Sequence, residues 1–272
     1  MYAIIFKKQG CDFINFLDNE MNCIESLKYH TEEPICMNDS CVDIADLILD
    51  ETYWKLWSAS FGKDAPPDFY CDKHKLMMDV MRVDDHTFKK NGHYRNPTNE
   101  AESRIYHELK RKGIADGVNN NHVIVSAKSG LPTEQDHNYK WYLANFERVL
   151  ENHNQKITLY KQNHPGYKCI FFIFDESSAY LVARNKNEIP DEIIPGAPFY
   201  GQIHHHFLDN NFISILRKLN ADFIIWHSPY KHYIFALPQI PQLPKTCVYE
   251  VSKLNELETI SYNKELIFQS EA

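Results

Sequence analysis

Four residues in the first half of the chain have the side chains that metal-assisted hydrolysis of a phosphodiester requires. They are Glu51, Asp68, Asp79 and Lys128. Mg²⁺ takes hard oxygen ligands, and proteins commonly hold it with carboxylates and leave room for the phosphate oxygens of a substrate. A lysine nearby can stabilise the negative charge that develops during the reaction. All four residues are therefore candidates for such a site.

Glu51 is expected on a helix. The apolar residues from position 42 to about position 60 recur at helical spacing, and Ser40 is available as the N-cap. In this pattern Glu51 lies on or beside the buried face rather than opposite to it.

The other three residues are expected on or next to strands. Asp68 follows two prolines in a loop, Asp79 interrupts the apolar run of a strand over 75–83, and Lys128 closes a short strand over 122–128. A buried carboxylate is unfavourable unless it is paired, hydrogen-bonded or bound to a metal. Asp79 therefore needs a partner, which is either a metal or a neighbouring cation.

Each candidate also has a structural explanation. Asp79 could pair with Arg82 in its own strand, and Asp68 could form a turn after the prolines. Glu51 could lie at the exposed rim of its helix, and Lys128 could extend from a strand end into solvent.

The pattern between positions 42 and 175 predicts an α/β fold. Helix, short strand, strand, inserted helix, strand, helix and buried strand follow one another. We expect a central mixed sheet that contains 75–83, 122–128 and 169–175, flanked by helices that include one over 138–153. The run over 169–175 is apolar throughout, as in a strand that is buried on both faces.

We expect residues 1–272 to form a single α/β domain, with a core over about 42–175 and a C-terminal extension over about 176–272. The extension should add strands to the sheet or form a lobe. Its predicted elements are a helix over 207–220 and strands over 222–226, 233–237 and 246–251.

This order of elements and acidic residues is similar to the core of the PD-(D/E)xK, or restriction-endonuclease-like, nuclease superfamily. The residues that carry the resemblance are Glu51, Pro67-Asp68, Asp79 and Ser126-Ala127-Lys128, within about half of the chain. The resemblance implies a restriction-endonuclease-like core and a Mg²⁺- or Mn²⁺-dependent nuclease that acts on DNA or RNA. It further implies that Asp79, Lys128, Glu51 and Asp68 are the catalytic residues, and that the three acidic residues among them are the ligands of the metal.

Two alignments with the family motif are possible. In the first, Pro67-Asp68 is the PD pair and Asp79-Val80-Met81 replaces acid-x-Lys, with Met in the place of Lys. In the second, Asp79 is the first acid and residues 126–128 form the acid-x-Lys, with Ser in the place of the acid. The second is preferred because a helix and a buried strand follow it directly. Either way one group is absent, so a non-catalytic binding or interaction protein on the same scaffold stays a second hypothesis.

Two histidine-containing segments offer weaker alternatives. His204 and His206 could share a strand face as a metal-binding pair, with Asp209 as the nearest third ligand, and a hydrolase could be built on that site. A polar turn before a helix explains the same residues. The segment Asp84-Asp85-His86 resembles a ligand cluster but is expected to begin a solvated loop.

Basic residues with an aromatic residue among them could bind nucleic acid. They are Lys73, His74 and Lys75, followed by Lys89, Lys90, His93, Tyr94 and Arg95. The net charge of −8 and the pI near 5.9 argue against broad adhesion to nucleic acid but allow a local basic groove.

The sequence argues against several other classes of protein. There is no P-loop, Rossmann glycine pattern, G-x-S-x-G elbow, HExxH or kinase motif. Seven cysteines without a CxxC favour free thiols over disulfides or a zinc ribbon. The first residues do not resemble a signal peptide, and no apolar run approaches the roughly 20 residues of a membrane span. We therefore expect a cytoplasmic protein that does not interact with membranes.

Overall fold

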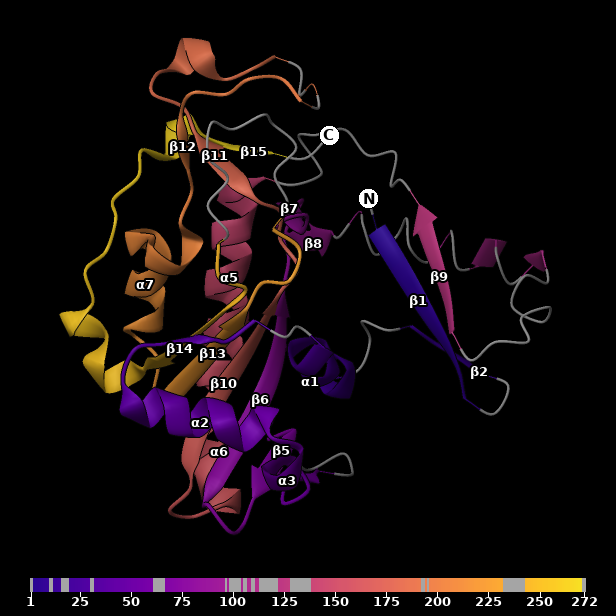
Figure 1. Ribbon diagram of the computed structural model, residues 1–272, viewed down its shortest axis with the longest axis vertical. Helices are drawn as coiled ribbons and strands as arrows, with labels where there is room; N and C mark the ends of the chain where they lie inside the picture. Colours follow the sequence, from indigo (N-terminus) through magenta and orange to yellow (C-terminus); the bar gives the residue numbers. More distant parts are fainter. Residues whose placement is uncertain are drawn as a thin grey trace.

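The centre of the fold is a seven-stranded mixed sheet in the order β3-β14-β13-β10-β6-β5-β4 (Figure 1). A computed structural model describes residues 2–9, 12–15, 20–29, 32–60, 67–95, 97, 104, 107–108, 111–112, 122–127, 138–191, 194, 196–231 and 243–270. The strands of the sheet are β3 (Ile35–Cys36), β14 (Thr246–Glu250), β13 (Phe223–His227), β10 (Lys168–Asp175), β6 (Leu76–Val83), β5 (Phe69–Cys71) and β4 (Ser58–Ala59). Strands β6, β10 and β13 run parallel to one another, and β3 runs parallel to β14. The pairs β13–β14, β5–β6 and β4–β5 are antiparallel.

Strand β10 lies between β6 and β13, as its continuous apolar sequence predicts. Phe171 and Ile173 face one hydrophobic cluster, and Ile170 and Phe172 face the other. All four are buried because both faces of the sheet are covered. The expected mixed sheet flanked by helices, with 169–175 next to 75–83, is confirmed.

Helices cover both faces of this sheet. Helices α5 (Tyr139–Asn154), α6 (Ile157–Asn163) and α7 (Asn210–Leu216) pack on one face, and α1 (Glu20–Tyr29) and α2 (Asp39–Leu49) pack on the other. The side chains of β6 alternate accordingly. Met77 and Met81 point towards α5 and α6, and Met78 and Val80 point towards α1 and α2. In the text below, the first of these faces is called the α5 face.

The helix expected over 42–60 differs from the observed structure. Helix α2 begins at Asp39, where the Asn38 side chain accepts a hydrogen bond from the backbone N–H of Cys41, so Asn38 and not Ser40 is the N-cap. The chain leaves the helical conformation at Asp50, which has extended backbone angles. A short helix α3 (Glu51–Trp54) follows before β4. Glu51 therefore begins a new helix instead of extending the face of α2.

The prediction that 122–128 belongs to the central sheet is wrong. Strand β9 (His122–Ala127) pairs antiparallel with β1 (Tyr2–Gln9), which also pairs with β2 (Asp12–Asn15), and the three form a separate sheet. The reason is that β6, the strand that carries Asp79, has no edge left to pair with β9. Both edges of β6 are occupied by β5 and β10, and both edges of β10 by β6 and β13.

The C-terminal part adds strands in two places. Strands β13 and β14 join the central sheet, and β11 (Tyr180–Val182), β12 (Gln202–Ile203) and β15 (Ile267–Gln269) form a small antiparallel sheet. The helix expected over 207–220 is shorter, because a 3-10 turn over His206–Leu208 precedes α7. The strand expected over 233–237 and most of the helix expected over 97–112 lie outside the described residues. Within the described ranges no helix is both long and apolar enough to cross a membrane.

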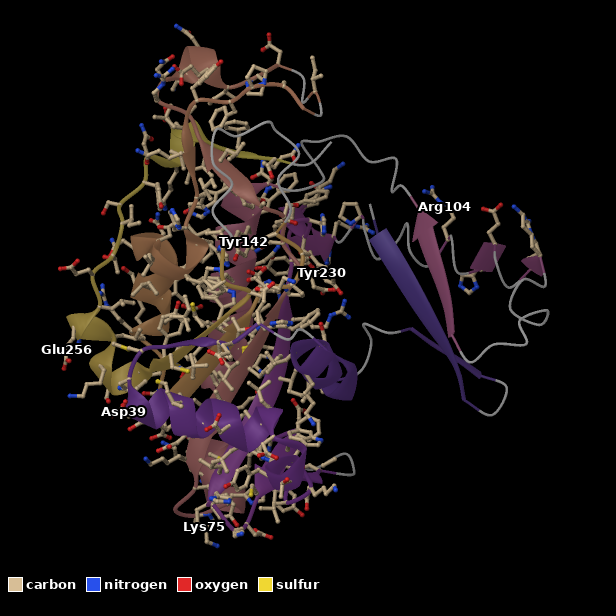
Figure 2. The ribbon with its side chains drawn as sticks, in the orientation of Figure 1. Asp39, Lys75, Arg104, Tyr142, Tyr230 and Glu256 are labelled. Atoms are coloured by element: carbon tan, nitrogen blue, oxygen red, sulfur yellow. The ribbon has the colours of Figure 1, made fainter. Side chains whose placement is uncertain are left out.

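The carboxyl end of β10 carries a fully buried carboxylate, Asp175. Its Oδ2 accepts hydrogen bonds from the Tyr142 hydroxyl at 2.5 Å and the Trp226 indole N–H at 2.9 Å. The remaining partners lie in the loops after β10 and β13 and are Ser177, Ser228 and Lys231. The labelled Tyr142 lies in the interior of the molecule (Figure 2). Asp175 thus joins helix α5 to two parallel strands and two loops.

In the segment Asp84-Asp85-His86, Asp85 and His86 are buried and Asp84 is half-buried, which corrects the prediction of a solvated loop. Asp85 accepts hydrogen bonds from the backbone N–H of Ser178 at 2.9 Å and from the Tyr180 hydroxyl at 2.7 Å. Asp84 accepts from the backbone N–H groups that follow it and closes the turn. These polar residues lie at the carboxyl ends of parallel strands, where buried backbone and side-chain groups need hydrogen-bond partners.

We expect Asp175→Asn to lower the free energy of unfolding by about 3–5 kcal/mol, because it removes the negative charge that faces the buried ammonium group of Lys231. Urea unfolding followed by tryptophan fluorescence would measure this. The control is Glu188→Gln, which breaks an exposed ion pair with Arg184 and should change the free energy of unfolding by less than about 1 kcal/mol. An equally small effect of Asp175→Asn would contradict the assigned role of Asp175.

Candidate functional site

The β5–β6 hairpin brings Asp68 and Asp79 together. Phe69 pairs with Met78 in this antiparallel ladder, so Asp68 lies opposite Asp79 one step further along. The Asp68 side chain accepts a hydrogen bond from the backbone N–H of Val80 at 2.7 Å, which holds its carboxylate beside β6. Two carboxylates that are separated in the sequence therefore meet on the α5 face of the sheet.

Asp79 is also bound by two side chains from the helices above it. Its Oδ2 is in contact with the His153 imidazole Nδ1, from α5, and accepts a hydrogen bond from the Tyr160 hydroxyl, from α6, at 2.8 Å. Asp79 is 3% exposed, whereas the His153 side chain is 23% exposed and so opens the site towards solvent.

The alternative in which Asp79 pairs with Arg82 is not observed. Arg82 binds Glu176 through two hydrogen bonds of 2.8 Å. Arg82 is three positions after Asp79 along β6, so the two side chains leave opposite faces of the sheet.

The electrostatics of the pair are unfavourable when both groups are charged. Burial, together with the charge of the neighbouring Asp79, raises the pKa of Asp68 to about 7, against a smaller lowering by the Val80 N–H. Burial and the Asp79 charge also raise the pKa of Tyr160. Near neutral pH Asp68 is therefore close to the midpoint of its titration. A divalent cation bound between the two carboxylates would relieve the same repulsion.

The donor set fits Mg²⁺ or Mn²⁺ as a two-carboxylate site. Mg²⁺ is commonly held by one or two carboxylates and keeps several coordination positions for water and phosphate. No group of three or more His, Cys, Asp or Glu side chains in the described part of the chain is placed to hold a metal by itself. Glu51 is the first residue of α3, and its side chain lies outside the described residues, so its role as a third ligand stays a prediction.

The structure brings together the two acidic residues of the first motif alignment. It does not place the two strands of the second alignment beside each other. Asp68 and Asp79 face each other, whereas Lys128 lies outside the described residues and β9 is not a neighbour of β6. The expected pairing of the strand over 122–128 with the strand of Asp79 is therefore not observed, and the predicted role of Lys128 lies outside the described residues. In the first alignment Met81 takes the place of the lysine, and it is buried in the core.

His153 and Tyr160 were not identified from the sequence. His153 lies at the end of the helical pattern that begins after Asn138, and Tyr160 belongs to α6, whose sequence ITLYKQN gives only a weak pattern. The sequence does contain an indication of these partners. A buried Asp in a strand requires hydrogen-bond donors, and the helix after Asn138 has a histidine near its end.

In the part of the chain that the structure describes, no metal-holding group is formed by His204, His206 and Asp209. His204 Nε2 is 2.8 Å from Asp209 Oδ2, and the Tyr139 hydroxyl donates to the same oxygen at 2.6 Å. Asp209 also caps α7, and its pKa is lowered by the hydrogen bonds from His204 and Tyr139 in spite of its burial. His204 and Asp209 therefore form a hydrogen-bonded pair, and the histidine metal site stays a sequence-based prediction.

A basic hairpin lies beyond the carboxyl end of β6. Strands β7 (Phe88–Lys90) and β8 (His93–Arg95) are joined by Asn91 and Gly92, which have φ of 51° and 81° as a tight hairpin turn requires. The Phe88 ring stacks on the Trp141 ring at 5.0 Å and anchors the hairpin to α5. The other basic segment, Lys73 to Lys75, lies at the opposite end of β6, so the two segments do not form one continuous surface.

Tyr94 on this hairpin is exposed and surrounded by cations. It is 52% exposed, with Lys89 Nζ at 5.6 Å and Arg148 Cζ at 4.6 Å from its ring centroid. An exposed aromatic ring with lysine and arginine beside it is suited to stack on a base while the cations contact phosphates.

No family model matches the chain, and no curated protein or solved structure is significantly similar to it. The chemistry must therefore be inferred from the site itself.

The raised pKa of Asp68 predicts a pH dependence of stability. Between about pH 4 and pH 7 the folded protein keeps a proton that the unfolded chain releases near pH 3.9, so the free energy of unfolding falls as the pH rises through this window and is constant above it. Asp68→Asn removes the titration. We expect the variant to lose this slope and, at pH 8 in EDTA, to be roughly 2 kcal/mol more stable than wild type. Chemical unfolding from pH 4 to pH 8 would measure it, and parallel pH profiles for the two proteins would contradict the coupling of the pair.

Proposed function

We propose that the protein is a metal-dependent phosphodiesterase that acts on nucleic acid, on a scaffold similar to the PD-(D/E)xK core. The observation that carries the proposal is the carboxylate pair of Asp68 and Asp79, held by the β5–β6 register with the pKa of Asp68 raised to about 7. Two opposed acids at one point of a sheet are unfavourable for folding, so their presence is best explained by a ligand of opposite charge.

The order of elements supports the same proposal. Helices α2 and α3, the antiparallel strands β4, β5 and β6, helix α5, and then β10 parallel to β6 follow one another along the chain. The first alignment expects the same order, which is a helix with Glu, a strand with Asp, a strand with an acidic residue, a helix and a final strand. Residues 84–137 are then an insertion between the acidic strand and its helix.

A divalent cation bound at this pair would supply Lewis-acid activation of a phosphoryl oxygen. Asp68 and Asp79 would hold it, and the His153 and Tyr160 donors orient the Asp79 carboxylate through its Oδ2. His153 is the side chain that extends from the buried pair to solvent, so it is placed to meet an incoming phosphate. These contacts would fix the geometry of the site before a substrate arrives.

Helix α5 links this site to the basic hairpin. Arg148, beside Tyr94, and His153, beside Asp79, are five residues apart on α5, which is about 7.5 Å along the helix axis. A single-stranded nucleic acid that stacks a base on Tyr94 and contacts Lys89 would therefore lie beside the helix that carries His153. We propose that the hairpin is the surface that binds nucleic acid.

One observation favours a second function. Met81 is buried at the position where the first alignment expects the lysine that stabilises developing charge. If the acidic pair binds a metal without this lysine, the protein would bind nucleic acid and not cut it. The second candidate is therefore a non-catalytic nucleic-acid-binding protein with the same two surfaces.

We expect Mn²⁺ to raise the melting temperature of the wild type at pH 8, where Asp68 is deprotonated. A concentration one hundred times the Kd would stabilise the fold by about 2.7 kcal/mol. Asp68→Asn and Asp79→Asn should remove the shift and abolish Mn²⁺-dependent cleavage of single- and double-stranded substrates, because each removes a metal ligand. Thermal unfolding and gel assays would measure both effects.

The matched control for this experiment is Asp43→Asn, which changes an exposed aspartate on α2 and should keep the wild-type response. No Mn²⁺ shift in the wild type would contradict both metal binding and the proposed activity. A shift without cleavage would favour the non-catalytic candidate.

Binding of nucleic acid should depend on the hairpin. In EDTA, we expect Tyr94→Ala to weaken binding of a fluorescent single-stranded oligonucleotide by roughly 1–3 kcal/mol, and Lys90→Ala to lower the salt dependence of log K by roughly 1. Fluorescence anisotropy over a range of KCl concentrations would measure both. The control is Lys75→Ala, at the opposite end of β6, which should leave the affinity unchanged. Equal losses for Lys75→Ala and Lys90→Ala would contradict a localised surface.

A further inference from the structure

A second site lies towards the opposite edge of the central sheet, near β3 and β14. Around β3 and β14 the structure contains a cavity of about 350 Å³, lined mainly by apolar side chains. They come from four segments and include Met37, Phe207, Leu208, Cys247 and Leu257. This volume lies at the low end of the range for small-molecule sites, which are typically apolar with a few polar groups.

One of the residues that line this cavity has a buried polar atom without a partner among the described residues. His206 lines the cavity and is 2% exposed, and its Nε2 has no hydrogen-bond partner among the described residues. The polar tip of Tyr249, another lining residue, is already used, because its hydroxyl donates to the Phe207 carbonyl at 2.9 Å. A buried nitrogen without a partner is unfavourable, and such a group in a folded protein calls for an explanation.

His206 is uncharged in this environment. Burial, and then the positive charge of Lys231, lower the pKa of His206 well below its ordinary value. A neutral imidazole nitrogen donates or accepts one hydrogen bond according to its tautomer. The partner that suits it is therefore a neutral oxygen rather than a strongly charged group, which the apolar walls would not solvate.

We propose that this cavity binds a small, largely apolar molecule with one hydroxyl or carbonyl oxygen, which hydrogen-bonds to His206 Nε2. At about 30 Å³ for each water-sized group, the cavity holds about a dozen non-hydrogen atoms. An uncharged aromatic or short aliphatic alcohol or ketone has this size and polarity.

The proposed ligand site is separate from the carboxylate pair. The cavity lies at β3 and β14, the pair lies at β5 and β6, and strands β13 and β10 separate β14 from β6. Three strand spacings correspond to about 14 Å. The inference therefore does not depend on the proposed nuclease activity and can be tested without metal or nucleic acid.

Equilibrium dialysis of the full-length protein against 2-naphthol and against naphthalene would test the site. The two probes have nearly the same size and differ by one hydroxyl group. We expect the wild type to bind both and to prefer 2-naphthol by about three- to tenfold, the effect of one net hydrogen bond. His206→Phe keeps an aromatic ring but removes Nε2, so it should bind both probes with equal affinity.

Two further variants test the position of the site. Leu208→Trp and Leu257→Trp would each fill the cavity and should lose binding of both probes, with folding checked by circular dichroism. The control His93→Phe, on the exposed strand β8, should keep the wild-type preference. The proposal would be overturned if the wild type bound neither probe, if His206→Phe retained the preference for 2-naphthol, or if both filled variants folded and still bound.

Discussion

The buried carboxylate of Asp175 determines where helix α5 lies on the sheet. It accepts hydrogen bonds from Tyr142 on α5 and Trp226 on β13, and it has a charge partner in Lys231. A buried carboxylate is stable only when its oxygens are satisfied, so these groups must stay in register with one another. Because α5 is held in this way, its later residues reach defined positions. One of these residues contacts Asp79 and another lies under Tyr94.

The candidate site follows from this arrangement and from one property of antiparallel strands. The short turn between β5 and β6 sets a register in which Asp68 lies opposite Asp79. Side-chain alternation then sends both carboxylates to the face that α5 and α6 cover, and sends Arg82 to the other face. The acidic pair is consequently separated from its nearest arginine in sequence and meets a histidine and a tyrosine instead. Local sequence spacing cannot reveal these two partners, because they come from 74 and 81 residues away.

The parts of the fold that were predictable from sequence are those with strong local patterns. The apolar run of β10, the strand of β6 and the helix after Asn138 each show a clear periodicity, and each was found. The placement of 122–128 was not predictable, because the sequence of a short apolar strand does not specify which edge of which sheet it joins. The role of Asp84 and Asp85 was misjudged for a related reason: three polar residues in a row suggest solvent, yet at the ends of parallel strands they satisfy buried groups. In the site, the acidic residues were identified, but their pairing required the sheet register.

The central claim is that the β5–β6 register creates a cation site between Asp68 and Asp79. The most direct measurement is the anomalous difference density of crystals grown at pH 8 and soaked in Mn²⁺. The account predicts a peak at about 2.0–2.2 Å from carboxylate oxygens of both Asp68 and Asp79, as short metal–oxygen bonds require. A crystal that shows no peak at this pair, or a peak only at other carboxylates, would contradict it.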